Sequence, residues 1–250
     1  MIDDAVALSA FLQSFAAIKS PKLLVHGGGR RATELATQMG IPQQMHQGRR
    51  ITDAVTLEIA TMVYGGSINK QIVAALQASG CNALGLCGAD GDLLKSVRRP
   101  VKDGIDFGYV GDVLPGTDTA LLQLLLDNGY TPVVAPLTHD GQGQLLNTNA
   151  DTMAQELAKA LAPLYSVKLV YTFEKNGVLL DTTDDASVIP LLEPGYYGEL
   201  KAAGTIYAGM IPKLDNAFAA VAAGVKQVVI GSAAQLEQIV AGHSGTIIQS

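Results

Sequence analysis

The amino-acid sequence predicts an α/β protein, a three-layer αβα sandwich in which helices cover both faces of a mostly parallel central sheet. Short apolar runs typical of buried strands alternate along the chain with segments of helical periodicity. The 250 residues, 48% of them hydrophobic, are enough to bury a sizeable core. A soft boundary near residues 163–167 divides the chain into two predicted lobes, 1–163 and 164–250, that share one continuous sheet.

The first half of the chain is predicted to begin with a helix over residues 8–18, because its apolar residues recur at helical spacing. A strand at 22–26 leads into a helix at 30–39, which Gly40 and Pro42 end. A long helix is predicted from Thr52 and Asp53 to about residue 78. A buried strand at 82–86 and short strands in hairpins over the more polar residues 93–113 follow.

The second half of the chain continues the alternation. A helix at 121–127 ends at Gly129, and a buried strand at 131–137 precedes a hairpin turn at Asp140 and Gly141. A helix opens at Asn149 and reaches about residue 161. The remaining predicted elements are a strand at 167–173, a loop at 174–177, a helix at 215–223, a strand at 225–230, a short helix and a strand at 246–248.

Composition and charge argue against several kinds of protein. The net charge is −6 and the basic residues are scattered, which argues against a nucleic-acid partner. Cys81 and Cys87 lack metal-ligand spacing and are expected to be buried thiols in a reducing cytoplasm. Asp3 and Asp4 stand where a signal peptide carries basic residues, and no apolar run approaches the roughly 18 residues of a membrane span. We therefore expect a cytoplasmic protein without a membrane partner or a side-chain metal site.

The most informative segment is the glycine turn Gly27-Gly28-Gly29, which joins the strand at 22–26 to the helix at 30–39. Residues without a Cβ let the backbone approach a ligand closely. The N–H groups at the following helix start favour an anion. The turn therefore predicts a site for a phosphate or a carboxylate, whereas a simple tight turn would need one glycine only.

Three further segments contain candidate binding or catalytic residues. Asn147, Asn149 and Asp151 gather at a loop-to-helix junction, where helix capping explains only one of them. Lys213 lies at the start of an otherwise apolar helix, a position that becomes favourable when an anion sits before it. Arg50, beside Arg49, suits a bidentate grip on a carboxylate. His26, at the end of a buried strand, is interpreted as a structural histidine.

Motifs for other chemistries are weaker. The sequence contains no P-loop, nucleophile elbow or Cys–His dyad. Gly27-Gly28-Gly29-Arg30-Arg31-Ala32 fits the loose dinucleotide pattern G-x-G-x-x-A. That pattern needs a second strand ending in an acidic residue about 20 residues later, which residues 43–50 do not provide. A NAD(P)-binding oxidoreductase stays an alternative interpretation.

Taken together, these pieces resemble the acetylglutamate kinase family of the amino acid kinase superfold. The six matching segments keep the family's order and approximate spacing and lie at residues 25–29, 48–52, 84–86, 129–133, 146–151 and 209–213. The resemblance implies phosphoryl transfer from ATP, with Mg²⁺, to the γ-carboxylate of N-acetyl-L-glutamate or N-succinyl-L-glutamate in arginine biosynthesis. Catalysis of this kind depends on positioning and charge stabilisation.

The resemblance also assigns roles to residues of the substrate lobe, 1–163. Gly28 and Gly29 would bind the acylated glutamate through backbone N–H groups. Arg50 would hold its α-carboxylate, and Asn147 would contact its N-acyl end.

In the ATP lobe, 164–250, Lys213 would stabilise the transferring phosphoryl group, and Asp151 would orient the catalytic lysines by ion pairing. The nucleotide would be bound by the loop that runs from Glu174 to Leu179 and by the segment from Thr205 to Tyr207. The candidate nucleotide-binding residues are Glu174, Gly177, Leu179, Thr205 and Tyr207.

The chain departs from the family pattern in two places. The family opens with a Lys-x-Gly-Gly strand carrying a second catalytic lysine, but this sequence begins at Met1-Ile2-Asp3-Asp4. We therefore expect an unpaired edge at 22–26 and reduced activity, which keeps a non-catalytic amino-acid-binding relative as another alternative. Phe173-Glu174-Lys175-Asn176-Gly177 replaces the usual Ser/Thr-Asp-Val-x-Gly, which indicates a divergent branch.

The resemblance further implies a homodimer that arginine does not inhibit. Arginine-inhibited relatives carry an extra N-terminal helix that ties dimers into a hexamer. The predicted helix at 8–18 faces the core and does not suit that role.

Overall fold

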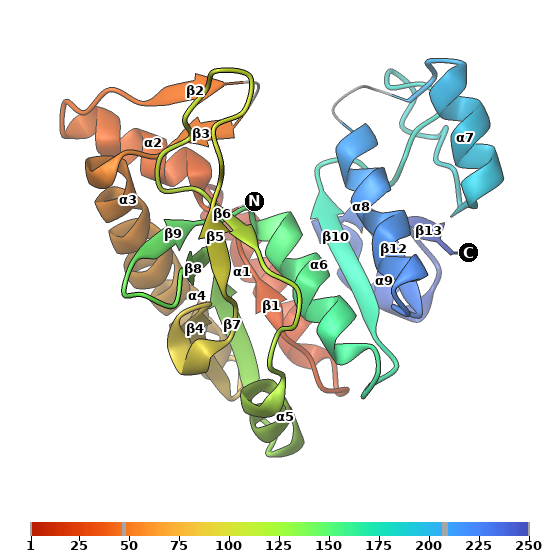
Figure 1. The fold of residues 1–250 in the computed structure, drawn as a ribbon. Coiled ribbons are helices and arrows are strands. Elements are labelled where there is room, and N and C mark those ends of the chain that lie inside the picture. The colour runs from red at the N-terminus through yellow and green to blue at the C-terminus, as the bar shows by residue number, and fades with distance from the viewer. Residues whose placement is uncertain (1, 47–48, 207–209, 250) are drawn as a thin grey trace. The chain divides into compact units, whose positions relative to one another are not determined.

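The computed structural model describes residues 2–46, 49–206 and 210–249 (Figure 1). It is a mixed α/β fold with a parallel central sheet, which confirms the predicted fold class. The chain divides into two compact units, one formed by Ile2–Ala5 with Lys19–Met153 and the other by Val6–Ile18 with Ala154–Ser250. We call them the glycine-turn unit and the C-terminal unit.

The central sheet of the glycine-turn unit is parallel and has the order β1-β7-β4. These strands span Leu24–Val25, Thr131–Ala135 and Ala83–Cys87. All five residues of β7 are buried although successive side chains point to opposite faces, so both faces of the strand are covered. Helices α4 (Asn69–Ala78) and α5 (Ala120–Asp127) pack against β7. Within the described residues β1 pairs with β7 alone and lies at an edge of the sheet, as expected.

The predicted long helix is continuous but not uniform. It starts as α3 (Ala54–Ala60), where the Asp53 carboxylate caps the helix by accepting a 2.8 Å hydrogen bond from the Thr56 N–H. A π-helical segment, Thr61–Ile68, then joins α3 to α4. A π-helix of this length is rare, and the sequence did not predict it.

Antiparallel hairpins complete the described part of the glycine-turn unit, beside helix α2 (Gly29–Gln38). They pair β2 with β3, β5 with β6 and β8 with β9. These strands span Gln44–His46, Arg49–Ile51, Ser96–Arg98, Gly111–Val113, Leu137–His139 and Leu145–Asn147. The β5–β6 pair confirms the predicted hairpin over 93–113. The β2–β3 hairpin was not predicted, because its strands are short and largely exposed.

The sheet of the C-terminal unit has the order β10-β12-β13-β11. Its strands span Lys168–Phe173, Gln227–Ser232, Thr246–Ile248 and Leu191–Leu192. β10 pairs with β12 and β11 pairs with β13 in parallel, whereas β12 and β13 are antiparallel. The four central residues of β12 are buried, and α8 and α9 both pack against this strand.

The described helices of the C-terminal unit include two departures from prediction. Helix α8 begins at Ile211 rather than at residue 215, since a proline near the first position suits a helix start. Helix α7 was not predicted at all. The helices span Ala5–Ala17 (α1), Ala150–Leu161 (α6, which opens in the glycine-turn unit), Pro194–Ala202 (α7), Ile211–Ala222 (α8) and Leu236–Ala241 (α9). None of the described helices is long and apolar enough to span a membrane.

Candidate functional site

The glycine turn lies between β1 and α2, packed against the π-helical segment. A Cβ on Gly28 would come within 2.6 Å of Ile68 Cδ1 and 2.8 Å of Tyr64 Cδ1. A larger residue at position 28 would therefore displace the side chain of Ile68 or Tyr64, which favours glycine there. Gly28 also caps α2 without a side-chain hydrogen bond, so the first N–H groups of that helix are suited to an anionic ligand.

The buried His26 side chain forms hydrogen bonds beside the glycine turn. Its side chain is only 4% exposed, and Nδ1 lies 2.8 Å from the Gly27 carbonyl oxygen, to which it donates. Nε2 lies 3.2 Å from the Asn69 side-chain nitrogen, which also donates to the Val133 carbonyl at 2.9 Å. Burial lowers the pKa of His26, so the neutral ring is favoured. The interpretation of His26 as a structural histidine is confirmed.

Arg50, on β3, reaches the start of α2. Its Nη2 donates to the Gly29 carbonyl and to Thr33 Oγ1, both at 2.7 Å, and its Nη1 donates to Gln43 Oε1. The structure therefore brings together two predicted site residues, Arg50 and Gly29. Thr33 and Gln43 were missed by the sequence analysis, because nothing in their local pattern distinguishes them from ordinary polar residues.

Asn147 lies at the end of β9 and connects to the end of β3 through Thr52. Its side-chain nitrogen donates to Thr52 Oγ1 at 3.0 Å, and its backbone N–H donates to the Tyr109 carbonyl at 2.9 Å. The Tyr109 N–H donates in turn to the Thr52 carbonyl at 2.7 Å. Gly108 has a φ of +68°, and a Cβ there would overlap the Thr52 carbonyl, so this backbone contact also requires a glycine.

A shallow cavity of about 410 Å³ opens elsewhere on the glycine-turn unit. It is lined by residues of α3, of the π-helical segment and of the loop before β9, including Glu58 and Gln144, and by Tyr109. Gly28, Gly29, Arg50 and Asn147 do not line it.

The C-terminal unit contains a larger cavity of about 640 Å³. Three predicted nucleotide-binding residues, Glu174, Gly177 and Leu179, line it together. Thr205 is next to Ile206, which lines the same cavity, whereas Tyr207 lies outside the described residues. The rest of the lining is Thr172, Phe173, Lys175, Val178, Thr182, Met210 and Ala233. A cavity of this size with a mainly apolar lining suits a small organic ligand.

Gly177 fixes the loop that forms one wall of this cavity. A Cβ on Gly177 would come within 2.7 Å of both Thr246 Oγ1 and Val188 Cγ1. The neighbouring Val178 N–H donates to Thr246 Oγ1 at 2.8 Å. The loop backbone therefore packs directly on the start of β13.

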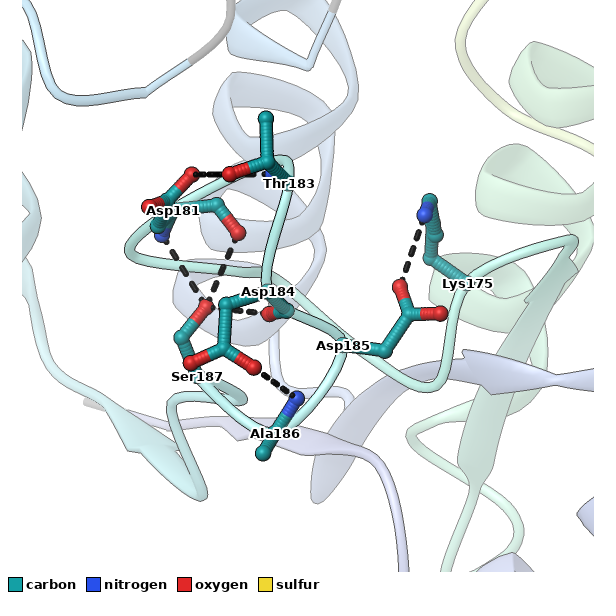
Figure 2. A network of polar contacts seen from close by, with 7 residues as sticks. All are labelled: Lys175, Asp181, Thr183, Asp184, Asp185, Ala186 and Ser187. Carbon is teal, nitrogen blue, oxygen red and sulfur yellow. Dashed lines mark hydrogen bonds and ion pairs between the residues drawn. The ribbon is translucent and has the colours of Figure 1, made fainter.

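The following loop folds on itself through short-range hydrogen bonds (Figure 2). The Asp181 carboxylate accepts from the backbone and hydroxyl of Thr183, at 2.8 and 2.7 Å. The Asp184 carboxylate accepts from the Ala186 N–H at 2.9 Å. Ser187 Oγ lies 3.0 Å from the Asp181 carbonyl and 2.7 Å from the Asp184 carbonyl. We call residues 181–187 the aspartate loop.

Lys213, in the first turn of α8, contacts a residue that lines the large cavity. Its ammonium is 3.7 Å from the centre of the Phe173 ring, and Phe173 lines the cavity. This cation–π contact offsets the unfavourable placement of a cation at a helix N-terminus. Two residues further on, Asp215 accepts hydrogen bonds from Tyr197 Oη at 2.7 Å and Lys201 Nζ at 3.0 Å, which fix α8 against α7.

Asp151 lies in the first turn of α6, two residues after the capping residue Asn149, whose side chain accepts from the Thr152 N–H at 2.9 Å. Asp151 belongs to the glycine-turn unit and Lys213 to the C-terminal unit, so the pairing implied between them stays a prediction. Among the described residues no group of three or more His, Cys, Asp and Glu side chains could hold a metal ion.

Comparison with known proteins gives a consistent result. The amino acid kinase family matches residues 1–232 of the chain. The acetylglutamate kinase of Phocaeicola vulgatus is 55% identical over 249 residues, which cover 100% of this chain and 95% of that protein. The acetylglutamate kinase of Cytophaga hutchinsonii is 56% identical over 240 residues, which cover 96% of this chain and 90% of that protein.

A solved structure extends the comparison to the fold. N-acetylglutamate synthase from Neisseria gonorrhoeae, complexed with coenzyme A and N-acetyl-glutamate, matches with a TM-score of 0.80 and 25% identity. The match covers 99% of this chain and 57% of that chain. The NAD(P)-binding alternative is not supported by these comparisons. Where its pattern requires a parallel strand with an acidic end, the structure forms the antiparallel β2–β3 hairpin.

We expect the stability of the protein to fall as the pH drops below about 6.5, the usual pKa of an unfolded histidine. Burial lowers the pKa of His26, so below that pH the unfolded chain binds a proton that the folded chain does not. The free energy of unfolding should decrease by up to about 1.4 kcal/mol per pH unit until the pH reaches the lowered pKa. Chemical denaturation between about pH 5 and 7 measures this slope.

The His26→Asn variant should be less stable but show a flatter pH dependence over the same range. His243→Asn serves as the matched control, because it removes an exposed histidine of the C-terminal unit and should leave the slope as it is. An equal slope in His26→Asn and the parent protein would contradict the assignment.

Proposed function

The chain belongs to the amino acid kinase family, and on this premise we propose that it transfers the γ-phosphoryl group of ATP to the γ-carboxylate of N-acetyl-L-glutamate. The observation that carries the proposal is the identity of 55% to an acetylglutamate kinase over the whole chain. The reaction would supply an acyl phosphate for arginine biosynthesis. N-Succinyl-L-glutamate is the second acceptor to test, because the loop at Phe173–Gly177 departs from the usual family pattern.

The glycine-turn unit would hold the acylated glutamate. The N–H groups of Gly28 and Gly29 stand at the start of α2, which suits a carboxylate. The Arg50 guanidinium is held beside them by its hydrogen bonds to Gly29 and Thr33 and would pair with the α-carboxylate of the substrate. The Asn147 amide, fixed by Thr52, would contact the N-acyl group.

The C-terminal unit would hold the nucleotide. The apolar wall of the large cavity, including Val178, Leu179 and Ile206, suits the adenine ring. The Lys213 ammonium beside that cavity is suited to phosphate oxygens. Mg²⁺, when bound on the phosphates, would neutralise part of their charge. The proposed acceptor lobe is residues 1–163 and the proposed ATP lobe is residues 164–250, whereas residues 6–18 and 154–163 belong to the C-terminal unit by their contacts.

The proposed chemistry needs no covalent protein intermediate. An oxygen of the substrate γ-carboxylate forms a bond to the γ-phosphorus of ATP, while the bond from that phosphorus to the β,γ-bridging oxygen breaks. ADP leaves with the electron pair of the broken bond. Lys213 would stabilise the charge that develops on the phosphoryl oxygens, and Asp151 would orient the lysines.

A direct assay tests the proposal. The purified protein, MgATP and N-acetyl-L-glutamate are incubated with hydroxylamine, which converts an acyl phosphate into a coloured hydroxamate. We expect hydroxamate formation that depends on all three components. N-Succinyl-L-glutamate in place of the acetyl compound decides the acceptor, and formation of hydroxamate from neither acceptor would refute the proposal.

Replacing Arg50 by alanine should raise KM for the acylated glutamate by about 10- to 100-fold, because a charge-assisted hydrogen bond to the substrate is lost. KM for ATP should change little. Steady-state kinetics with each substrate varied in turn measures both values. Arg49→Ala, which removes the exposed neighbouring guanidinium, is the control. A change in KM for ATP alone would show that Arg50 does not bind the acceptor.

Replacing Lys213 by alanine should instead lower kcat by about 100- to 1,000-fold with little change in either KM, because its charge matters most in the transition state. Lys226→Ala, at an exposed lysine of the same unit, should retain full turnover. Single-turnover and steady-state measurements separate the two effects. Weaker ATP binding at normal kcat would make Lys213 a ground-state anchor.

The proposal includes a cytoplasmic homodimer that arginine does not inhibit. Val55 and Met62, seven residues apart along one continuous helix, are each 46% exposed, and Leu84 on β4 is 39% exposed. The second copy of the chain would cover these side chains in the proposed dimer. Light scattering should give twice the chain mass of 26.0 kDa. A hexamer, or inhibition by millimolar arginine, would refute this part.

A further inference from the structure

We propose that Lys175 binds a phosphate group of the nucleotide and that Asp185 competes with that phosphate for the Lys175 ammonium. The inference rests on the proposed function and assigns to the nucleotide site a residue outside the six motif segments. Lys175 lines the large cavity, and its Nζ lies 2.7 Å from Asp185 Oδ1 on the aspartate loop (Figure 2).

Lys175 supplies positive charge to the lining of the large cavity. Among the described residues that line it, Glu174 and Lys175 are the charged ones. Glu174 repels phosphate, so the Lys175 ammonium is the cation among these described lining residues that can attract it. While Lys175 is paired with Asp185, much of this attraction is cancelled.

The ion pair is suited to exchange. The Lys175 and Asp185 side chains are 52% and 69% exposed, and ion pairs between exposed groups contribute little to stability. A nucleotide phosphate carries more negative charge than a single carboxylate and bonds an ammonium through several oxygens. The ammonium would therefore move from Asp185 to the nucleotide without a large penalty.

The aspartate loop does not need the ion pair to keep its shape. Asp181, Asp184 and Ser187 close the loop by hydrogen bonds of their own (Figure 2). Backbone hydrogen bonds from Leu180 to Ser187 and from Ile189 to Val178 close its base, at 2.9 and 2.8 Å. Removing the charge of Asp185 should leave this scaffold intact and free Lys175 for the ligand.

Two interpretations of the ion pair give opposite expectations for Asp185. If the pair is only a structural latch, Lys175→Gln and Asp185→Asn should both weaken nucleotide binding. If Asp185 competes with the nucleotide, Lys175→Gln should weaken binding and Asp185→Asn should strengthen it. The sign of the Asp185 effect is therefore the decisive measurement.

The experiment is isothermal titration of the full chain with MgATP, at low and high salt, for the single variants and the double variant. We expect Kd to rise about 5- to 10-fold in Lys175→Gln and to fall about 2- to 3-fold in Asp185→Asn, with both effects smaller at high salt. The double variant should match Lys175→Gln, because Asp185 acts only through Lys175. Circular dichroism confirms that each variant is folded.

Lys168→Gln is the matched control, since Lys168 begins the strand whose end precedes Lys175 and carries the same charge. It should leave Kd close to that of the parent protein. Weaker binding in Asp185→Asn, unchanged binding in Lys175→Gln, or an equal loss in Lys168→Gln would overturn the proposal.

The binding assay is independent of the acceptor. Opposite shifts in Kd without any hydroxamate formation would support the role of Lys175 and refute the proposed acceptor. Normal hydroxamate formation with no shift in Kd would refute the role of Lys175 and leave the proposed function standing.

Discussion

The acceptor side of the molecule depends on how closely the backbone at Gly28 approaches the π-helical segment. Because Ile68 and Tyr64 occupy the space where a Cβ would lie, a larger residue at position 28 would have to displace one of these side chains. The position of the turn sets the start of α2, and it also places the Gly29 carbonyl that accepts a hydrogen bond from Arg50. His26 and Asn69 fix the turn from the β-sheet side. The lack of a side chain at Gly28 thus helps to position His26, Arg50 and the start of α2 next to the glycine turn.

In the C-terminal unit, too, a glycine allows the backbone to pack closely against a neighbouring segment. Gly177 allows the loop to pack on Thr246, and hydrogen bonds between neighbouring residues shape the aspartate loop. Of the cations near the large cavity, Lys213 contacts an aromatic ring, and Lys175 pairs with an exposed carboxylate. A fixed loop that carries an exposed, exchangeable ion pair suits a ligand that must bind and leave during each cycle.

The sequence predicts elements whose signal is local. The apolar runs of β7 and β10 and the periodic pattern of α5 and α6 led to the right elements within a few residues. The β2–β3 hairpin and α7 were missed, because β2 is polar and α7 contains Pro194 and two glycines. Gly28, Gly29 and Arg50 were identified singly, but Thr33, Gln43 and Tyr64 were not. Their contribution comes from contacts between distant segments, which no local pattern encodes.

The π-helical segment makes the protein sensitive to the number of residues between α3 and α4. An α-helix turns by about 100° per residue, and the wider turns of a π-helix advance through a smaller angle. The eight residues Thr61–Ile68 therefore set the angular phase between α3, which follows Thr52, and α4, which begins with Asn69. Deleting one residue would rotate one half of the helix against the other and aim Asn69 away from His26. Insertions and deletions should be tolerated less well here than substitutions at exposed positions.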